Sequence, residues 1–127
     1  MREDGVVYTP KDAAIVSAPE QGMQRQVLAY NKYVMLVRHR FEKGWKGTNH
    51  KHPQEQLVYV VSGRILFDYG ANSIELSSGD SILVQGDVEH RATALENSDV
   101  LDVFVPYRED YANLPLQLAQ SFNALSM

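Results

Sequence analysis

The chain has 127 residues, enough for one domain around a single hydrophobic core and too few for two. Hydrophobic residues make up 44% and charged residues 22%, which is typical of a folded globular protein and unlike a disordered, collagen-like or coiled-coil chain. With 12 Lys and Arg against 16 Asp and Glu, the net charge is -4, so there is no basic surplus for nucleic acid or an anionic membrane.

Two absences narrow the chemistry and the location. The sequence has no cysteine, which excludes disulfides and thiolate chemistry and leaves imidazole, carboxylate and amide oxygen as the available metal ligands. No stretch approaches the ~20 apolar residues of a membrane span, and the polar start has no signal-peptide pattern. We therefore expect a cytoplasmic protein.

The first part of the chain, residues 1–23, is expected to form an arm. Gly5, Pro10, Pro19 and Gly22 interrupt it, so it has room for one short strand.

Eight short β-rich runs follow, separated by clusters of Gly, Asn, Asp and Ser, and this spacing predicts a sandwich or barrel. We expect them to form a single domain over residues 24–112. The runs are 25–30, 33–41, 56–61, 64–69, 73–76, 81–84, 90–95 and 100–105.

The last segment, residues 113–127, is the one part that looks helical. Its apolar residues recur at helical spacing, and Pro115 suits the first turn of a helix. These apolar residues are Leu114, Leu118, Phe122 and Leu125.

The period of two in a strand indicates which side chains share a face. In the run 100–105, Val100, Asp102 and Phe104 lie on one face, so an acid is expected inside an apolar row.

The run 33–41 has apolar residues on both faces, which suggests a strand packed on two sides, as at a dimer contact. His39 shares a face with apolar residues and is expected to be a core histidine or to line the barrel. Arg38 and Arg40, opposite, are expected to face solvent or a partner. The face of His39 carries Met35, Val37, His39 and Phe41.

Three of the four histidines gather in two places that can supply a metal site. His50 and His52, at i and i+2, can point the same way, and Gln56 can add an amide oxygen. A returning hairpin would bring His90 to the same point and leave open positions for a substrate. For the pair alone, the alternative is two surface histidines beside a turn.

Two glycine-bounded segments carry a family resemblance. Residues 44–63 fit the first cupin motif, G-x5-H-x-H-x3-E-x6-G, with Gln56 where the family usually has glutamate. Residues 79–90 resemble the second motif, G-x5-P-x-G-x2-H, with Gln85 and Asp87 replacing proline and glycine. The chain is identified as a member of the cupin superfamily. The resemblance implies an all-β double-stranded β-helix, the cupin jelly-roll barrel, here with a short C-terminal helix, that holds one divalent metal ion.

Within the cupins, the KdgF-type subgroup is more similar. Its members convert 4,5-unsaturated monouronates from pectin or alginate into open-chain keto acids, and they share H-x-H-P-x-E-Q at 50–56 and D-x-F-x-P-x-R at 102–108. The likeness implies metal ligands at His50, His52, Gln56 and His90, catalytic residues at Asp102 and Arg108, and substrate-binding residues at Phe104 and Arg108.

Each implied role suits its side chain. Asp102 would transfer a proton, Arg108 offers a rigid fork for a uronate carboxylate, and Phe104 a wall for the sugar ring. Asp102 could instead be a structural acid bonded to a neighbouring strand. Arg108 could be a solvated charge or a bridge to Glu109 or Asp110.

Four neutral ligands leave the ion its full double charge, which favours Lewis-acid chemistry on an anionic substrate. Imidazole-rich sites accept Ni, Fe, Zn, Mn, Co or Cu. We expect a small-molecule substrate, an anionic sugar acid, with no nucleic-acid or membrane partner, and a homodimer. The alternatives are another metal-cupin activity, such as a dioxygenase, lyase or cyclase, and a non-catalytic small-molecule-binding cupin.

Overall fold

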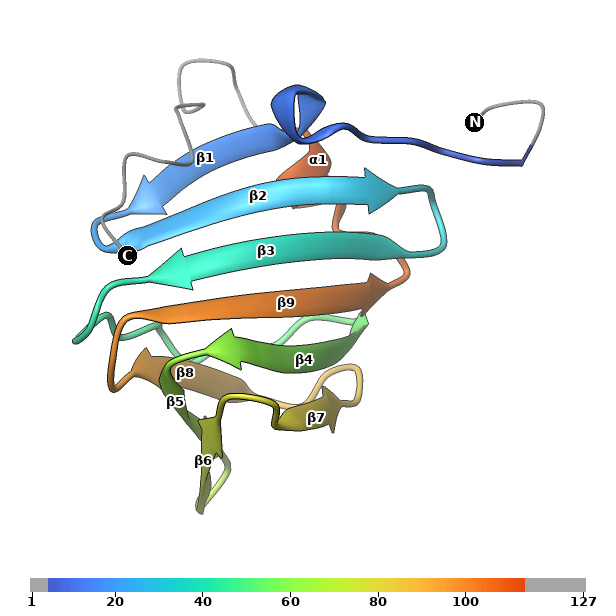
Figure 1. Cartoon of the computed structure of the whole chain (residues 1–127). Coiled ribbons are helices and arrows are strands. Elements are labelled where there is room, and N and C mark those ends of the chain that lie inside the picture. Colours follow the sequence, from blue (N-terminus) through green and yellow to red (C-terminus); the bar gives the residue numbers. More distant parts are fainter. Residues whose placement is uncertain (1–4, 114–127) are drawn as a thin grey trace.

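A computed structural model describes residues 5–113, in which the strands form two antiparallel sheets (Figure 1). One sheet has the strand order β1-β2-β3-β9-β4-β7, and the other has the order β6-β5-β8. The strands are β1 Ile15–Glu20, β2 Met23–Tyr30, β3 Met35–Phe41, β4 Glu55–Ser62, β5 Arg64–Tyr69, β6 Asn72–Ser77, β7 Ser81–Val84, β8 His90–Ala94 and β9 Ser98–Val105. A 3-10 turn, Lys11–Ala13, precedes them, and the short helix α1, Glu109–Ala112, follows.

The eight runs predicted to be strands are β2 to β9, with ends that differ by at most two residues. This confirms the all-β jelly-roll barrel. In the segment expected to be an arm, Ile15–Glu20 forms β1, which pairs antiparallel with β2 and extends the larger sheet. The helix predicted from the apolar pattern of 114–127 lies outside the described residues.

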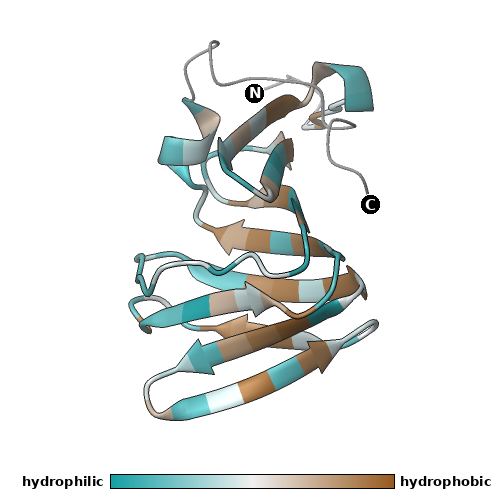
Figure 2. Cartoon of the chain, turned by 90° about the vertical axis from the view of Figure 1, so that its left-hand side faces the viewer, coloured by the Kyte–Doolittle hydropathy of each residue, from teal (hydrophilic) through white to brown (hydrophobic). Residues whose placement is uncertain are grey.

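The two sheets face each other across the main core. The burial pattern of β3 alternates strictly, and the face that carries His39 is the buried one, as its sequence pattern predicted. In β9 Val100, Asp102 and Phe104 are likewise buried together. Figure 2 shows the corresponding alternation of hydrophobic and hydrophilic bands along the strands.

Two turns explain residues in the family motifs. Gly63 has a φ of 96°, and a Cβ there would lie 2.3 Å from Ser98 Oγ, so only glycine fits between β4 and β5. Asp87, which replaces a motif glycine, has a φ of 65°. Aspartate tolerates this left-handed conformation better than most residues, so the turn that leads to His90 keeps its shape.

The outer face of the larger sheet exposes several large apolar side chains. Leu57, Tyr59, Leu83 and Val105 are each about half exposed, and a shallow groove beside them is lined mainly by apolar residues. Among the described residues, the structure contains no helix long and apolar enough to span a bilayer.

Candidate metal centre

The backbone brings the two histidine segments together. His50 and His90 form an antiparallel bridge, in which the amide of each residue donates to the carbonyl of the other, at 3.0 Å and 2.8 Å. His52 lies two residues beyond His50, so its ring turns to the same side. The ligand atoms of the three imidazoles all lie within 4.8 Å of one another, close enough to hold one metal ion.

Each ring is oriented by a backbone carbonyl two residues away, which lies within hydrogen-bond distance of Nδ1. The carbonyls are those of Thr48 for His50 at 3.0 Å, Gln54 for His52 at 3.0 Å and Val88 for His90 at 2.7 Å. Because a carbonyl can only accept, Nδ1 carries the proton in each neutral ring and Nε2 keeps its lone pair. This is the tautomer that binds a metal through Nε2.

Burial favours the neutral form of two of these rings. The side chains of His52 and His90 are almost completely buried, and desolvation lowers the pKa of both. Arg108 lowers the pKa of His52 further, and the neighbouring histidines lower that of His90. Neutral imidazole is the form that a metal ion requires.

Gln56 completes the cluster in a way that points to a cation. Its Oε1 lies 3.1 Å from Nε2 of His52, and its Nε2 donates to Oδ1 of Asp102 at 2.9 Å. His52 therefore has an oxygen beside each ring nitrogen but, when neutral, only one N–H to share between them. With the proton on Nδ1, the lone pairs of His52 Nε2 and Gln56 Oε1 face each other with no hydrogen between them. A divalent ion bound to both Nε2 and Oε1 would resolve it, so the residues present fit a metal.

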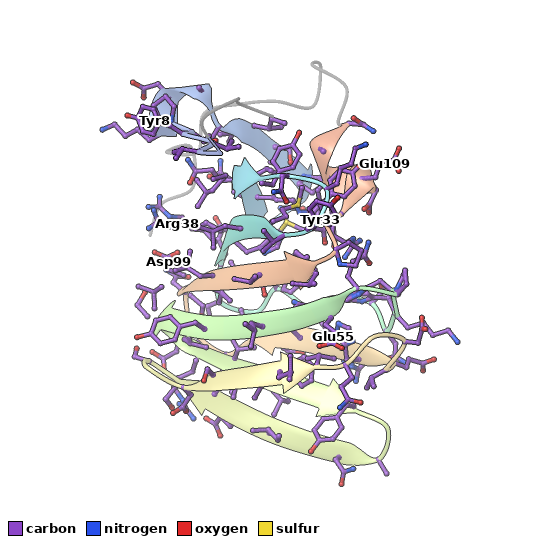
Figure 3. The ribbon with its side chains drawn as sticks, turned by 90° about the vertical axis from the view of Figure 1, so that its right-hand side faces the viewer. Tyr8, Tyr33, Arg38, Glu55, Asp99 and Glu109 are labelled. Carbon is purple, nitrogen blue, oxygen red and sulfur yellow. The ribbon has the colours of Figure 1, made fainter. Side chains whose placement is uncertain are left out.

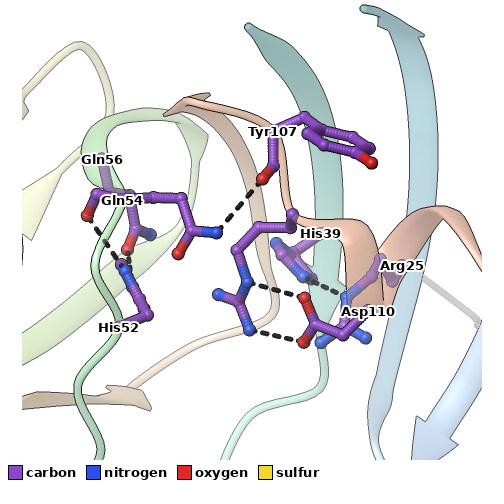
Figure 4. Close-up of polar contacts among 8 residues, drawn as sticks. Arg25, His39, His52, Gln54, Gln56, Tyr107 and Asp110 are labelled. Atoms are coloured by element: carbon purple, nitrogen blue, oxygen red, sulfur yellow. Dashed lines mark hydrogen bonds and ion pairs between the residues drawn. The ribbon is translucent and has the colours of Figure 1, made fainter. Parts of the chain in front are cut away.

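Asp102 is a buried member of a longer network. Its Oδ2 lies 2.7 Å from Nδ1 of His39, and Nε2 of His39 accepts a hydrogen bond from Nε of Arg25 at 3.0 Å. Figure 4 draws the contacts at the two ends of this network, between His52 and Gln56 and between Arg25 and His39. Asp102 is thus bonded to neighbouring strands and also lies beside the three clustered histidines.

These residues surround a cavity of about 140 Å³. Its wall includes Gln56, Asp102, Phe104 and Arg108 together with two of the clustered histidines, His50 and His90. All seven residues that the sequence predicted for the site therefore lie at the cavity or contact a residue that does.

Arg108 is held at the cavity by an acid. Its Nε and NH2 donate to the two carboxylate oxygens of Asp110 at 3.0 Å and 2.8 Å, so the bridge considered from the sequence is present. The Arg108 side chain is nevertheless only 12% exposed, and its Cζ lies 4.1 Å from the centre of the Tyr111 ring. The guanidinium of Arg108 therefore lines the cavity while two of its nitrogens bind the exposed carboxylate of Asp110.

Arg25 and Tyr111 are among the cavity residues that the sequence did not predict as site residues. Arg25 lies with its Cζ 3.6 Å from the centre of the Tyr111 ring, and both residues line the cavity. The sequence carried a signal for Arg25, because it alternates with Met23 and Val27 on an otherwise apolar face of β2. Tyr111, on the short helix after the last strand, had no such signal.

The comparisons with known proteins agree with this geometry. Residues 37–105 match the family model described as the cupin domain. The chain belongs to the cupin family. It is 32% identical over 92 residues to the pectin degradation protein KdgF of Dickeya dadantii (strain 3937), which covers 71% of this chain and 84% of that protein.

Two solved structures are also similar. KdgF from Halomonas sp. is 33% identical, with a TM-score of 0.75, and the match covers 82% of this chain and 98% of that one. An RmlC-like cupin from Shewanella frigidimarina NCIMB 400 is 30% identical, with a TM-score of 0.77, over 84% and 96% of the two chains. The likeness to KdgF proteins thus extends over most of this cupin.

Proposed function

We propose that this cupin is a metal-dependent enzyme that converts a 4,5-unsaturated monouronate into the open-chain keto acid. The observation that carries the proposal is the placement of Asp102 and Arg108 at the same cavity as the histidine cluster. The identity of about one third to KdgF proteins, one of them described as a pectin degradation protein, supports the substrate class. The cavity is smaller than the ~300–1,000 Å³ of a drug-sized pocket, which suits a single sugar ring.

His50, His52, Gln56 and His90 would hold the metal. A divalent ion with these neutral ligands would supply Lewis-acid polarisation of a substrate oxygen.

The polar residues around the cavity would position the sugar acid. The guanidinium of Arg108 binds the uronate carboxylate, exchanging part of its contact with Asp110 for the substrate. Phe104, which is buried and lines the cavity, provides a flat surface for the ring. Burial of these groups away from water strengthens the interaction of the arginine with the carboxylate.

Asp102 would move the proton. The anomeric hydroxyl gives its proton to the carboxylate as the bond between the anomeric carbon and the ring oxygen breaks. The ring oxygen becomes the carbonyl oxygen of the keto acid, and the far carbon of the former double bond receives a proton from Asp102. The reaction is an isomerisation, in which one proton is taken up and one returned and nothing is oxidised or reduced.

The test follows the loss of ultraviolet absorbance of a 4,5-unsaturated monouronate. The purified protein should accelerate this loss well above the spontaneous rate, chelation should abolish the acceleration, and one or more added divalent ions should restore it. With enough metal added to keep the site full, Asp102→Asn should lower turnover about 10²–10⁴-fold, the usual contribution of a positioned acid or base. A fully metallated protein without acceleration would overturn the proposed reaction.

A matched control is available on the same strand. Asp99 lies on the opposite face of β9 and pairs with Arg38 instead of the cavity residues. Asp99→Asn should leave turnover unchanged. Equal losses in the two variants would remove Asp102 from proton transfer.

We also propose that the protein is a homodimer, formed through the outer face of the larger sheet. The half-exposed side chains of Leu57, Tyr59 and Leu83 support this proposal, because they would be buried against the same surface of a second copy. Light scattering should give the mass of two chains for the wild type and of one chain for Leu83→Glu.

A further inference from the structure

We propose that Arg25 and His39 are positioning residues: they fix the hydrogen-bond directions of a row in which the carboxylate of Asp102 turns the amide oxygen of Gln56 toward the three histidines. The inference rests on the metal centre of the proposed function, but not on the reaction. It arises from a row of polar side chains that crosses the larger sheet from β2 to β4 and ends at the metal cluster.

The row contains one residue from each of four adjacent strands. Arg25 on β2 lies directly opposite His39 on β3. Asp102 on β9 lies one diagonal step from His39, and Gln56 on β4 one further diagonal step from Asp102. Contacts of 3.0 Å, 2.7 Å and 2.9 Å join successive members. With the contact to His52 the row has four links, of which the one between His39 and Asp102 is buried and the other three are partly buried.

The directions of the hydrogen bonds from Arg25 to Asp102 follow from the donor of Arg25. The guanidinium of Arg25 can only donate, so Nε2 of His39 must accept and cannot carry a proton. Burial lowers the pKa of His39, and the neutral ring then has its proton on Nδ1, facing Asp102. The carboxylate accepts from His39 through one oxygen, and its other oxygen is left to accept from Gln56.

The last bond sets the metal ligand. Because Asp102 only accepts, the Gln56 group beside it must be the NH2 group, and the amide oxygen turns toward His52. An amide turned over would present NH2 to the histidines, and NH2 has no lone pair to offer a metal. Amide orientation therefore decides whether the cluster has three ligands or four.

Asp102→Asn exposes the role of Arg25, because the new side chain has one oxygen and one NH2 group. If that NH2 faced His39, the ring would have to accept at Nδ1 and carry its proton on Nε2, against the donor of Arg25. This arrangement is blocked, so the NH2 should face Gln56 and turn its amide over. The variant should then lose the fourth ligand, and its metal affinity should fall about 10–100-fold.

Removing the donor of Arg25 should relieve this conflict. In Arg25→Met the ring of His39 is free to move its proton to Nε2 and to accept at Nδ1. Gln56 can then keep its oxygen toward the histidines even when Asp102 is replaced by asparagine. The loss of affinity caused by Asp102→Asn should thus be at least about tenfold smaller in the Arg25→Met protein than in the wild type.

The experiment is a double-mutant cycle on the affinity for Co²⁺, measured from its visible absorption in competition with a chelator. Arg108→Met serves as the matched control, since Arg108 is a second cation against Tyr111 and contacts Asp110 instead of His39. In that background the effect of Asp102→Asn should equal the wild-type effect. Equal effects of Asp102→Asn in all three backgrounds would overturn the inference.

A second measurement needs no variant. Long-range nitrogen–proton NMR spectra of the metal-free wild type should show the proton of His39 on Nδ1, and a proton on Nε2 would overturn the inference. The outcomes separate the two proposals. A wild type that binds Co²⁺ and is active without this coupling would overturn only the role of Arg25 and His39, whereas a wild type that binds no Co²⁺ would overturn the metal centre itself.

Discussion

The three clustered histidines and the glutamine beside them are held in place by different means. The rings of His50, His52 and His90 are each fixed by a backbone carbonyl two residues away. Gln56 is fixed by Asp102, which lies 46 positions further along the chain, and Asp102 contacts His39 across 63 positions. Three of the proposed ligands are therefore oriented by local chain geometry, and the proposed fourth depends on the assembly of the whole sheet.

This difference predicts how the two parts respond to damage. A locally oriented ligand keeps its orientation as long as its own turn is intact. A ligand oriented by a side chain of another strand can be lost by a change there, such as Asp102→Asn, although no residue of the cluster is altered. The orientation of the histidines should thus withstand mutations on other strands, whereas the orientation of Gln56 should respond to them.

The largest effect is expected from the local part. His90→Ala removes one of three clustered imidazoles and one side of the cavity wall. Affinity for Co²⁺ should fall by more than the about 10–100-fold expected of a residue that only orients a ligand, and turnover should fall to the spontaneous rate. The measurements are the Co²⁺ titration and the ultraviolet assay. Glu89→Gln, at the exposed neighbouring position, should retain both properties, and a His90→Ala protein with normal affinity would remove His90 from the ligand set.

A smaller effect is expected on substrate binding, because Arg108 contributes charge as well as shape. Arg108→Lys keeps the charge but loses the planar fork that matches a carboxylate. It should lower kcat/KM about 10–100-fold, mainly through KM. Steady-state kinetics over a range of uronate concentrations measures this split.

The ion pair between Arg108 and Asp110 predicts a change of KM in the opposite direction. Asp110→Asn releases the fork from its exposed partner, so KM should fall by up to about fivefold, the value of a surface ion pair. If both variants raised KM equally, Asp110 would be part of the binding surface instead of a competitor for Arg108.

The same distinction between local and long-range order explains what the sequence could predict. The histidine site was readable because H-x-H on one strand and glycines at fixed spacing report local geometry. The alternation of β9 placed Asp102 inside for the same reason. The role of His39 was not readable, since its partners Arg25 and Asp102 come from different strands, and strand pairing is set by the whole fold.

The sequence also could not predict which partner Arg108 binds. The sequence left Arg108 between a substrate role and a bridge to Glu109 or Asp110. The structure shows the bridge to Asp110 and also places Arg108 at the cavity. The bridge forms because Asp110 lies in the short helix that begins directly after Arg108, and the substrate role stays a prediction.

In the metal-free protein, a pH titration of stability should separate the contribution of His39 from that of the clustered histidines. Burial lowers the pKa of His39, so the unfolded chain binds a proton near the ordinary pKa of 6.5 that the folded chain does not, despite the opposing bond to Asp102. This contribution is fully present above about pH 6.5 and is lost as the pH falls below it. His52 and His90, whose pKa values are also lowered by burial, act in the same direction.

Removing His39 should flatten that dependence without abolishing it. Urea unfolding of His39→Gln between about pH 7.5 and about pH 5.5 should show a slope smaller than that of the wild type by up to about 1.4 kcal/mol per pH unit. The remaining slope belongs to the clustered histidines. An unchanged slope would mean that His39 binds a proton equally in the folded and unfolded chains.

The smallest effect is expected from an arginine and an aspartate on the same two strands as His39 and Asp102, but on the other face. Arg38 donates to Asp99 at 2.8 Å, and Figure 3 shows the pair on neighbouring strands. The Arg38 side chain is 32% exposed, so water screens this pair far more than the contacts in the cavity. Arg38→Gln should cost less than about 1 kcal/mol in urea unfolding and leave Co²⁺ affinity and turnover unchanged. A loss of Co²⁺ affinity in this variant would show that the sheet transmits any disturbance to Gln56, and the specific row through His39 would no longer be needed to explain its orientation.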